Sequence, residues 1–145
     1  MKVLVAAGII ALAIVGAMVC ASRPASAPTS KMHYSLARIE VVSTPAEQER
    51  GLGGRPQIPD DYGMLFAFAK ADSYGFWMKD MQAPIDIIWI NDDGTVAGIL
   101  DAIATSTYPA IFYPPKPIRY ALETRAGLAK EHGWATSTQL SLPLR

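Results

Sequence analysis

The chain has 145 residues, with 13 Lys and Arg against 13 Asp and Glu, so its formal net charge at pH 7 is zero. Binding to nucleic acid without regard to sequence needs a strongly basic face, so no nucleic-acid partner is expected. The single cysteine, Cys20, lies near the N-terminus, which excludes disulfides and cysteine-based metal sites from the rest of the chain. No cofactor is expected.

The N-terminus has the layout of an export signal. Lys2 is followed by an apolar run over residues 3–19 and then by small residues, which is the order of regions in a secretory signal. We expect residues 1–21 to be a cleaved signal peptide or an N-terminal membrane anchor, because the run is close to the shortest that spans a bilayer. Lipidation at Cys20 is a third alternative. All three predict an extracytoplasmic protein (periplasmic or secreted, possibly membrane-anchored) that contacts the membrane only through this segment.

The rest of the chain divides into a linker and one domain. Residues 22–34 are rich in Pro, Ser and Ala and are expected to form a flexible linker. Residues 35–145 are enough for one hydrophobic core and too few for two domains. We therefore expect a single β-rich domain over these residues.

The clearest local signal in the domain is the start of a helix. Residues 35–42 alternate apolar and polar side chains, which predicts a half-buried strand. Next, Thr44 precedes a proline at the first helical position and is followed three residues later by Glu47. This spacing predicts a capped helix. Gly51 is expected to end it after about two turns.

The following segments are mostly strand patterns separated by turn residues. The run at 85–90 is apolar at nearly every position, which predicts a strand buried on both faces. Further strands are expected at residues 64–68, 74–78, 95–103, 119–123 and 139–142, with a hairpin turn at 91–94, an irregular proline-rich segment at 105–117 and a short helix at 126–132. The expected fold class is mostly β (α+β), connected largely by hairpins: a single compact curved sheet or small barrel with two short helices.

Charged residues beside apolar runs are the first candidates for a site, because buried charges are costly unless paired. Lys79 and Asp86 lie at the two ends of one turn and could line one pocket, with Asp86 as a base or acceptor. Arg50 and Arg55 flank a glycine-rich bend and could hold a carboxylate or phosphate. The preferred interpretation of both pairs is structural: a salt bridge between Lys79 and Asp86 or caps for their turn, and one arginine paired with Asp86 or Glu123.

Aromatic and acidic residues offer further candidates. If Trp77 faces solvent, it becomes a platform for a sugar ring or an aromatic ligand, although packing is the commoner role. Tyr113, in the proline-rich segment, could line a groove for an extended peptide or belong to a rigid lid. Glu123 with Asp86 could form the carboxylate pair of glycoside chemistry. The two histidines have no His or Cys neighbour at ligand spacing, so no metal site is expected.

Six short blocks of the domain stand in an order that carries further information: residues 44–52, 63–66, 76–79, 84–88, 113–115 and 120–123. Together they resemble the DUF192 family, a prokaryotic family of unknown function. The resemblance runs from about residue 41 to about residue 127 and implies a compact β-rich domain, often behind a signal peptide or anchor, with no established activity. The chain departs from the family pattern at Gly53 and at residues 80–81.

The leading hypothesis is a non-enzymatic extracytoplasmic binding module, whose partner is an unknown small ligand or envelope protein. It rests on aromatic and charged residues at loops and on the lack of a catalytic constellation. One alternative is a small hydrolase or lyase with Asp86 and Glu123 as acids and Lys79 or Arg55 as electrostatic stabiliser. That alternative requires these side chains to meet in one cleft. The other alternative is a structural envelope protein, which requires internally paired charges and no cleft.

Overall fold

The structure is a computed structural model that describes residues 36–144. The leader expected over residues 1–21 and the linker expected over residues 22–34 lie outside the described residues. Within residues 36–144, no helix has the length and apolar character needed to cross a membrane.

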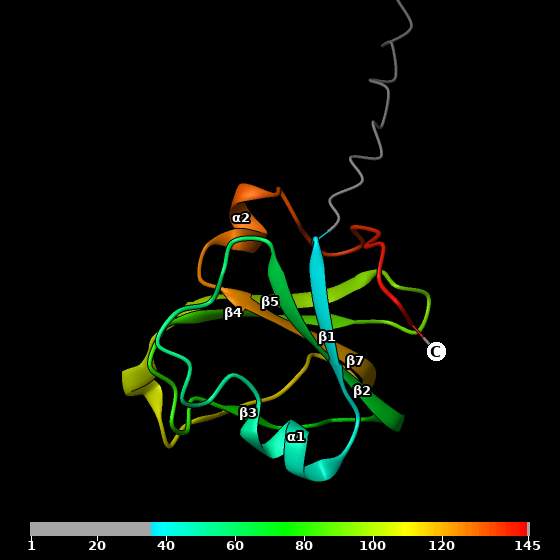
Figure 1. The fold of residues 1–145 in the computed structure, drawn as a ribbon. Coiled ribbons are helices and arrows are strands. Elements are labelled where there is room, and N and C mark those ends of the chain that lie inside the picture. The colour runs from blue at the N-terminus through cyan, green and yellow to red at the C-terminus, as the bar shows by residue number, and fades with distance from the viewer. Residues whose placement is uncertain (1–35, 145) are drawn as a thin grey trace, which may run out of the picture. The chain divides into compact units, whose positions relative to one another are not determined.

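A mixed five-stranded sheet forms the centre of the domain, as Figure 1 shows. Its strands are β1 (Arg38–Val42), β2 (Tyr62–Asp72), β4 (Ile85–Ile90), β5 (Val96–Ile103) and β7 (Ile118–Arg125). A separate two-stranded sheet pairs β3 (Phe76–Trp77) with β6 (Ile111–Phe112), and the helices are α1 (Pro45–Arg50), the 3₁₀ turn η1 (Thr105–Thr107) and α2 (Leu128–Glu131). The strand order of the main sheet is β1-β2-β7-β4-β5, with β1 parallel to β2 and the other pairs antiparallel.

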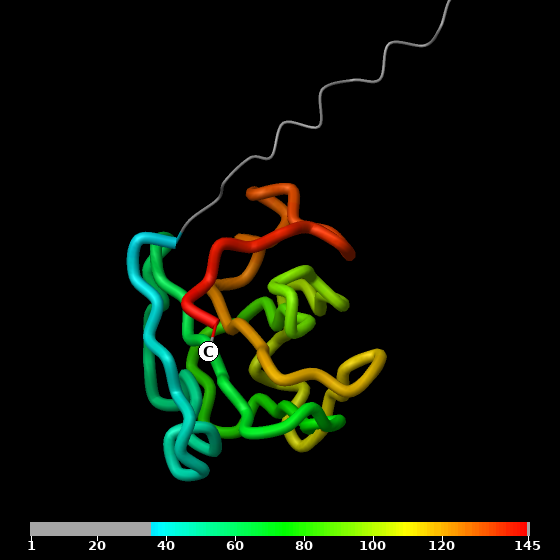
Figure 2. The backbone as a smooth tube through the Cα atoms, turned by 90° about the vertical axis from the view of Figure 1, so that its right-hand side faces the viewer, coloured from blue at the N-terminus to red at the C-terminus, as the bar shows by residue number. Residues whose placement is uncertain are grey.

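The sheet is covered on both faces, which explains why β4 has almost no polar residue. All six residues of β4 are buried. Because successive side chains of a strand point to opposite faces, Ile87 joins the core on the side of α1 and β3, and Ile88 joins the core on the side of α2. Figures 1 and 2 show α1 and β3 on one side of the sheet, with α2 and the C-terminal segment on the other.

Local sequence signals predicted these elements well. The strand at 85–90 and the turn at 91–94 are confirmed, with Gly94 at φ 83° in the turn between β4 and β5. The helix predicted after Thr44 is confirmed as α1. The mostly β class with two short helices is confirmed as well.

Of the two expected forms, a curved sheet or a small barrel, the structure has an open sheet rather than a closed barrel. Three predictions about strand pairing were wrong. Only β4 and β5 are joined as a hairpin within the main sheet. The strand expected at 139–142 is reduced to an isolated bridge between Gln139 and Thr95. In the proline-rich segment at 105–117, β6 does pair with β3. These pairings join segments far apart in sequence, and local patterns carry no information about them.

The cap of α1 yields a testable prediction. The backbone N–H of Glu47 donates to Thr44 Oγ1, and the Glu47 carboxylate in turn accepts from the backbone N–H of Thr44 at 3.1 Å. We expect Thr44→Ala to lower the free energy of unfolding by about 1 kcal/mol, measured by chemical denaturation. Thr136→Ala, at an exposed position, is the control and should change it by less than about 0.5 kcal/mol. Equal losses in both variants would contradict a capping role.

Candidate functional site

A buried carboxyl group lies at the centre of the main sheet. Glu123 is on β7, where it pairs with Met64 of β2 and Ile87 of β4, so its side chain lies on the face covered by α1 and β3. The residue is only 5% exposed, and Glu123 Oε2 has no hydrogen-bond partner in the described part of the chain. Burial raises the pKa of Glu123 to about 8, and a hydrogen bond from the backbone of Leu52 opposes that rise only in part. The group therefore keeps a proton at neutral pH.

Aromatic rings surround this carboxyl and form the walls of a cavity of about 300 Å³, which we name the aromatic pocket. Phe66 and Phe68 share one face of β2 because they are two residues apart. The chain then returns so that the Tyr74 ring stacks on Phe68, with 3.6 Å between ring centroids. Phe76 meets Phe66 edge to face at 5.5 Å. Trp77 completes the set of aromatic lining residues.

Glycine at position 51 lies directly against the carboxyl group. The backbone of Gly51 has φ 48°, a conformation that residues with a side chain rarely adopt. A Cβ atom there would lie 3.3 Å from Glu123 Oε2 and 3.3 Å from the Phe66 ring. The residue that ends α1 therefore has little room for a side chain between Glu123 and Phe66.

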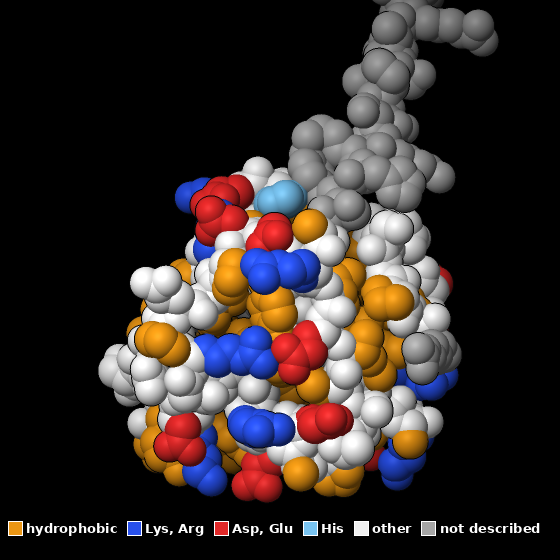
Figure 3. Space-filling model, viewed as in Figure 1, with side chains coloured by type: hydrophobic (Ala, Val, Ile, Leu, Met, Phe, Trp, Pro, Cys, Tyr) orange, Lys and Arg blue, Asp and Glu red, His pale blue; other side chains and the backbone are white. Residues whose placement is uncertain are grey.

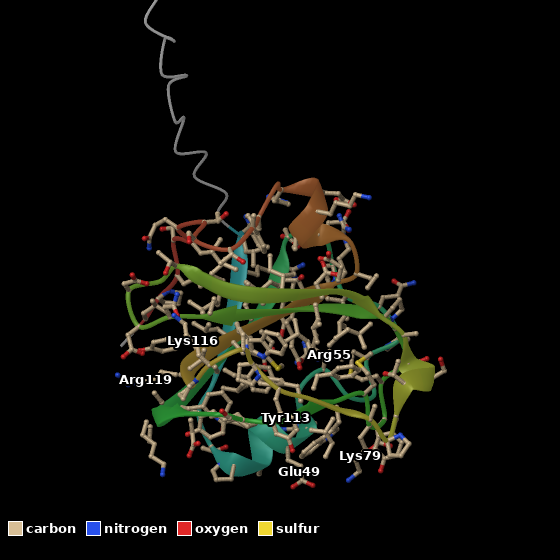
Figure 4. The ribbon with its side chains drawn as sticks, turned by 180° about the vertical axis from the view of Figure 1, so that it is seen from behind. Glu49, Arg55, Lys79, Tyr113, Lys116 and Arg119 are labelled. Carbon is tan, nitrogen blue, oxygen red and sulfur yellow. The ribbon has the colours of Figure 1, made fainter. Side chains whose placement is uncertain are left out.

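The rim of the aromatic pocket carries charged residues of both signs. Lys79 Nζ lies 3.7 Å from the Glu49 carboxylate, and both side chains are largely exposed. Figure 4 shows Glu49, on α1, and Lys79 close to each other at the bottom of the view. Arg50, at the end of α1, is exposed and also lines the pocket. Among the described residues, no ion pair reaches Glu123.

Asp86 lies on the opposite face of the sheet and has a structural role. Its partner in β7 is Thr124, one residue beyond Glu123, so the two carboxyl groups point to opposite sides. Asp86 is fully buried and accepts hydrogen bonds from the backbone N–H groups of Ala102, Gly127 and Ala129 at 2.8–2.9 Å. The predicted carboxylate pair is therefore wrong.

The salt bridge predicted between Lys79 and Asp86, and the shared pocket they were to line, are wrong for the same reason. Lys79 lies at the rim on the α1 side, beside Glu49. Asp86 caps backbone amides on the α2 side.

The two arginines of the glycine-rich bend have separate environments. Arg55 donates to the Glu40 carboxylate at 2.9 Å and to the Tyr62 hydroxyl at 2.8 Å. An arginine does fix this loop to the sheet, as predicted, but its partners are on β1 and β2 rather than Asp86 or Glu123. Figure 3 shows Lys and Arg side chains beside Asp and Glu on this face of the molecule, so no broad basic surface is available there for an anion.

The two exposed aromatic candidates lie near the mouth of the pocket. Trp77 is 36% exposed and lines the pocket, which satisfies the condition set for it as a ligand platform. Tyr113 is 57% exposed. Its ring and the side chain of Ile111 lie within 3.2 Å of the position that a Cβ on Gly75 would take. Tyr113 is thus outside the pocket lining but next to it.

The sequence contains a signal for part of the pocket wall. The large apolar residues at 64, 66 and 68 alternate along the strand, which places the rings of Phe66 and Phe68 on one face. Tyr74 and Gly51 were missed as site residues, because their positions depend on how β3 and α1 pack on the sheet. No group of His, Cys, Asp and Glu in residues 36–144 has the geometry to hold a metal ion.

Comparisons with known proteins agree with this fold. Residues 27–142 match the family DUF192, described as "Uncharacterized ACR". A crystal structure of a candidate transcription regulator from Sinorhizobium meliloti 1021 is similar, with 33% identity, a TM-score of 0.65 and coverage of 68% of this chain and 76% of that one. A protein of unknown function from Novosphingobium aromaticivorans DSM 12444 shares 30% identity, with a TM-score of 0.63 and coverage of 68% and 70%. A comparison with curated proteins finds no match.

Proposed function

The chain belongs to DUF192, a family of unknown function, and from the geometry of the aromatic pocket we propose that it is a non-enzymatic, extracytoplasmic binding module for a small ligand. The observation that carries the proposal is the buried Glu123 carboxyl at the floor of an open, aromatic cavity. Ligand sites typically combine an apolar lining with a few polar groups that fix orientation. Export is proposed from the N-terminal sequence pattern alone.

A buried acid with one unpartnered oxygen is hard to explain as a means of holding the fold together. A buried polar group without a partner costs about 1–3 kcal/mol, and proteins pair most of such groups. Asp86, on the other face of the sheet, accepts hydrogen bonds from three backbone N–H groups, as expected for a buried carboxylate with a purely structural role. Glu123 differs from it in facing a cavity, so a ligand group can supply the missing partner.

The two alternative functions have less support. A hydrolase or lyase with Asp86 and Glu123 as its acids requires both in one cleft, and they lie on opposite faces of the sheet. A purely structural envelope protein requires that no cleft exist and that every charge be paired internally. The aromatic pocket fails the first condition, and Glu123 Oε2 is a buried polar atom without a partner.

Thermal unfolding of the purified full-length protein with small aromatic and aliphatic amines, alcohols and carboxylic acids tests the proposal. A ligand at a hundred times its dissociation constant stabilises by about 2.7 kcal/mol, which raises the midpoint of a domain this size by several degrees. Trp77→Ala should remove the shift, because that ring lines the pocket. Tyr108→Ala, which removes another exposed aromatic outside the lining, is the matched control and should keep it. No shift with any compound, or equal shifts in the two variants, would contradict the proposal.

A further inference from the structure

Several titratable groups line the aromatic pocket together with Glu123. The titratable groups that line the aromatic pocket with it are Glu49 and Arg50 from α1, Tyr74 before β3, and Lys79 after β3. Lys79 is paired with Glu49 at the rim, and Tyr74 donates its hydroxyl hydrogen to the carbonyl of Lys70.

The neighbouring strands bring no charge to the acid. At its register, β2 and β4 contribute Met64 and Ile87. In the described part of the chain, then, no cation forms an ion pair with the Glu123 carboxyl. If the group ionises in this environment, a ligand cation can supply an ion-pair partner that it lacks among these residues.

The walls of the pocket favour a cation as well. The faces of aromatic rings carry partial negative charge, so they attract a cation and disfavour an anion. A cavity of about 300 Å³ is at the small end of ligand sites. These features together define a small ligand with one cationic group and an apolar body.

We propose that the aromatic pocket binds a small organic amine, whose ammonium group hydrogen-bonds to the Glu123 carboxylate while its apolar body lies among Phe66, Phe68, Tyr74, Phe76 and Trp77. Glu123 lines this pocket, and its Oε2 is the carboxyl oxygen left without a hydrogen bond. This inference rests on the proposed binding function and names the ligand class of the same pocket.

Binding of an ammonium ion must release a proton. The empty pocket holds a neutral carboxylic acid at neutral pH, because burial raises the pKa of Glu123 to about 8. The complex contains an ammonium ion and a carboxylate, so the proton of the carboxyl group passes to solvent when an already protonated amine enters. Below about pH 8, the affinity for the amine should therefore rise about tenfold for each pH unit.

Three probes of similar size test the ligand class: phenethylamine, its neutral analogue 2-phenylethanol, and the anion 3-phenylpropionate. Isothermal titration calorimetry of the full-length protein should show binding of phenethylamine with the strongest affinity of the three. At neutral pH, titrations in two buffers with different ionisation enthalpies should report release of close to one proton per amine bound. From about pH 5.5 to about pH 7.5 the affinity for phenethylamine should rise about a hundredfold.

Variants separate this inference from the proposed function. Glu123→Gln should abolish proton release and remove the pH dependence, while Asp101→Asn, which removes an exposed carboxylate on β5 outside the pocket lining, should leave both unchanged. A different result is that 2-phenylethanol binds as tightly as phenethylamine, releases no proton, and no longer binds to the Trp77→Ala variant. That result overturns the amine class, and the binding function stands. If phenethylamine fails to bind, the amine class is likewise overturned. In that case, the thermal-unfolding test with the other compounds decides whether the proposed binding function stands.

Discussion

Asp86→Asn is expected to lower the free energy of unfolding by about 3 kcal/mol, because the substitution removes charge from a fully buried hydrogen-bond acceptor. Asp86 Oδ1 accepts from the N–H groups of Ala102 and Gly127, and Oδ2 accepts from that of Ala129. An asparagine can keep one of these oxygens, but its amide nitrogen is a donor and would face another donor. Hydrogen bonds to a charged partner contribute about 1.5–3 kcal/mol each.

The destabilisation caused by Asp86→Asn should also affect β5, because Asp86 accepts from the backbone N–H of Ala102, whose conformation is unusual. Ala102 has φ 48°, which is unusual for a residue with a side chain, and it lies where the register of β5 against β4 shifts. Chemical denaturation of the variant measures the loss. Asp101→Asn, at the exposed neighbouring position of β5, is the control and should change the free energy of unfolding by less than about 0.5 kcal/mol. An Asp86→Asn variant as stable as the control would refute the structural role.

At high pH, Glu123→Gln is expected to raise the free energy of unfolding relative to the parent protein, whereas Asp86→Asn lowers it. The pKa of Glu123 rises from 4.5 to about 8 on folding, because burial disfavours the charged form. Above pH 4.5 the unfolded chain loses this proton while the folded protein keeps it. The contribution of Glu123 to stability therefore falls as the pH rises from about 4.5 to about 8, and is constant beyond. At about 1.4 kcal/mol per pKa unit, the full effect is on the order of 5 kcal/mol.

Glutamine does not titrate, so the Glu123→Gln variant does not lose stability in this way as the pH rises. The difference in free energy of unfolding between Glu123→Gln and the parent protein should shift in favour of the variant by several kcal/mol between about pH 5 and about pH 8.5. Denaturation curves of both proteins at each pH measure it, and taking the difference cancels the titration of all other groups. Glu49→Gln, at the exposed rim, is the matched control and should show no such trend. Parallel pH profiles for Glu123→Gln and the parent would mean that the buried carboxyl is already ionised in the folded state.

These two carboxyl groups show how far sequence reasoning reaches. Both were singled out because acids beside apolar runs are rarely without a role, and both are buried. Their roles could not be separated from sequence. Asp86 pairs with Thr124, and Glu123 with Ile87, so a register one residue different would have placed both carboxyl groups on the same face. That register is set by packing of β7 between β2 and β4, which come from distant parts of the chain.

The sequence by itself determined the elements whose stabilising interactions are local. Thr44 and Glu47 cap α1 because they are three residues apart, and 85–90 is a buried strand because it has hardly any polar side chain. The mostly β class and the membership in DUF192 could also be read from the chain. The tertiary structure alone decided the open sheet and the site. Five aromatic rings and Glu123 meet there from segments up to some sixty residues apart, and no rule of spacing along the chain reports on contacts between strands that pair only when the whole sheet forms.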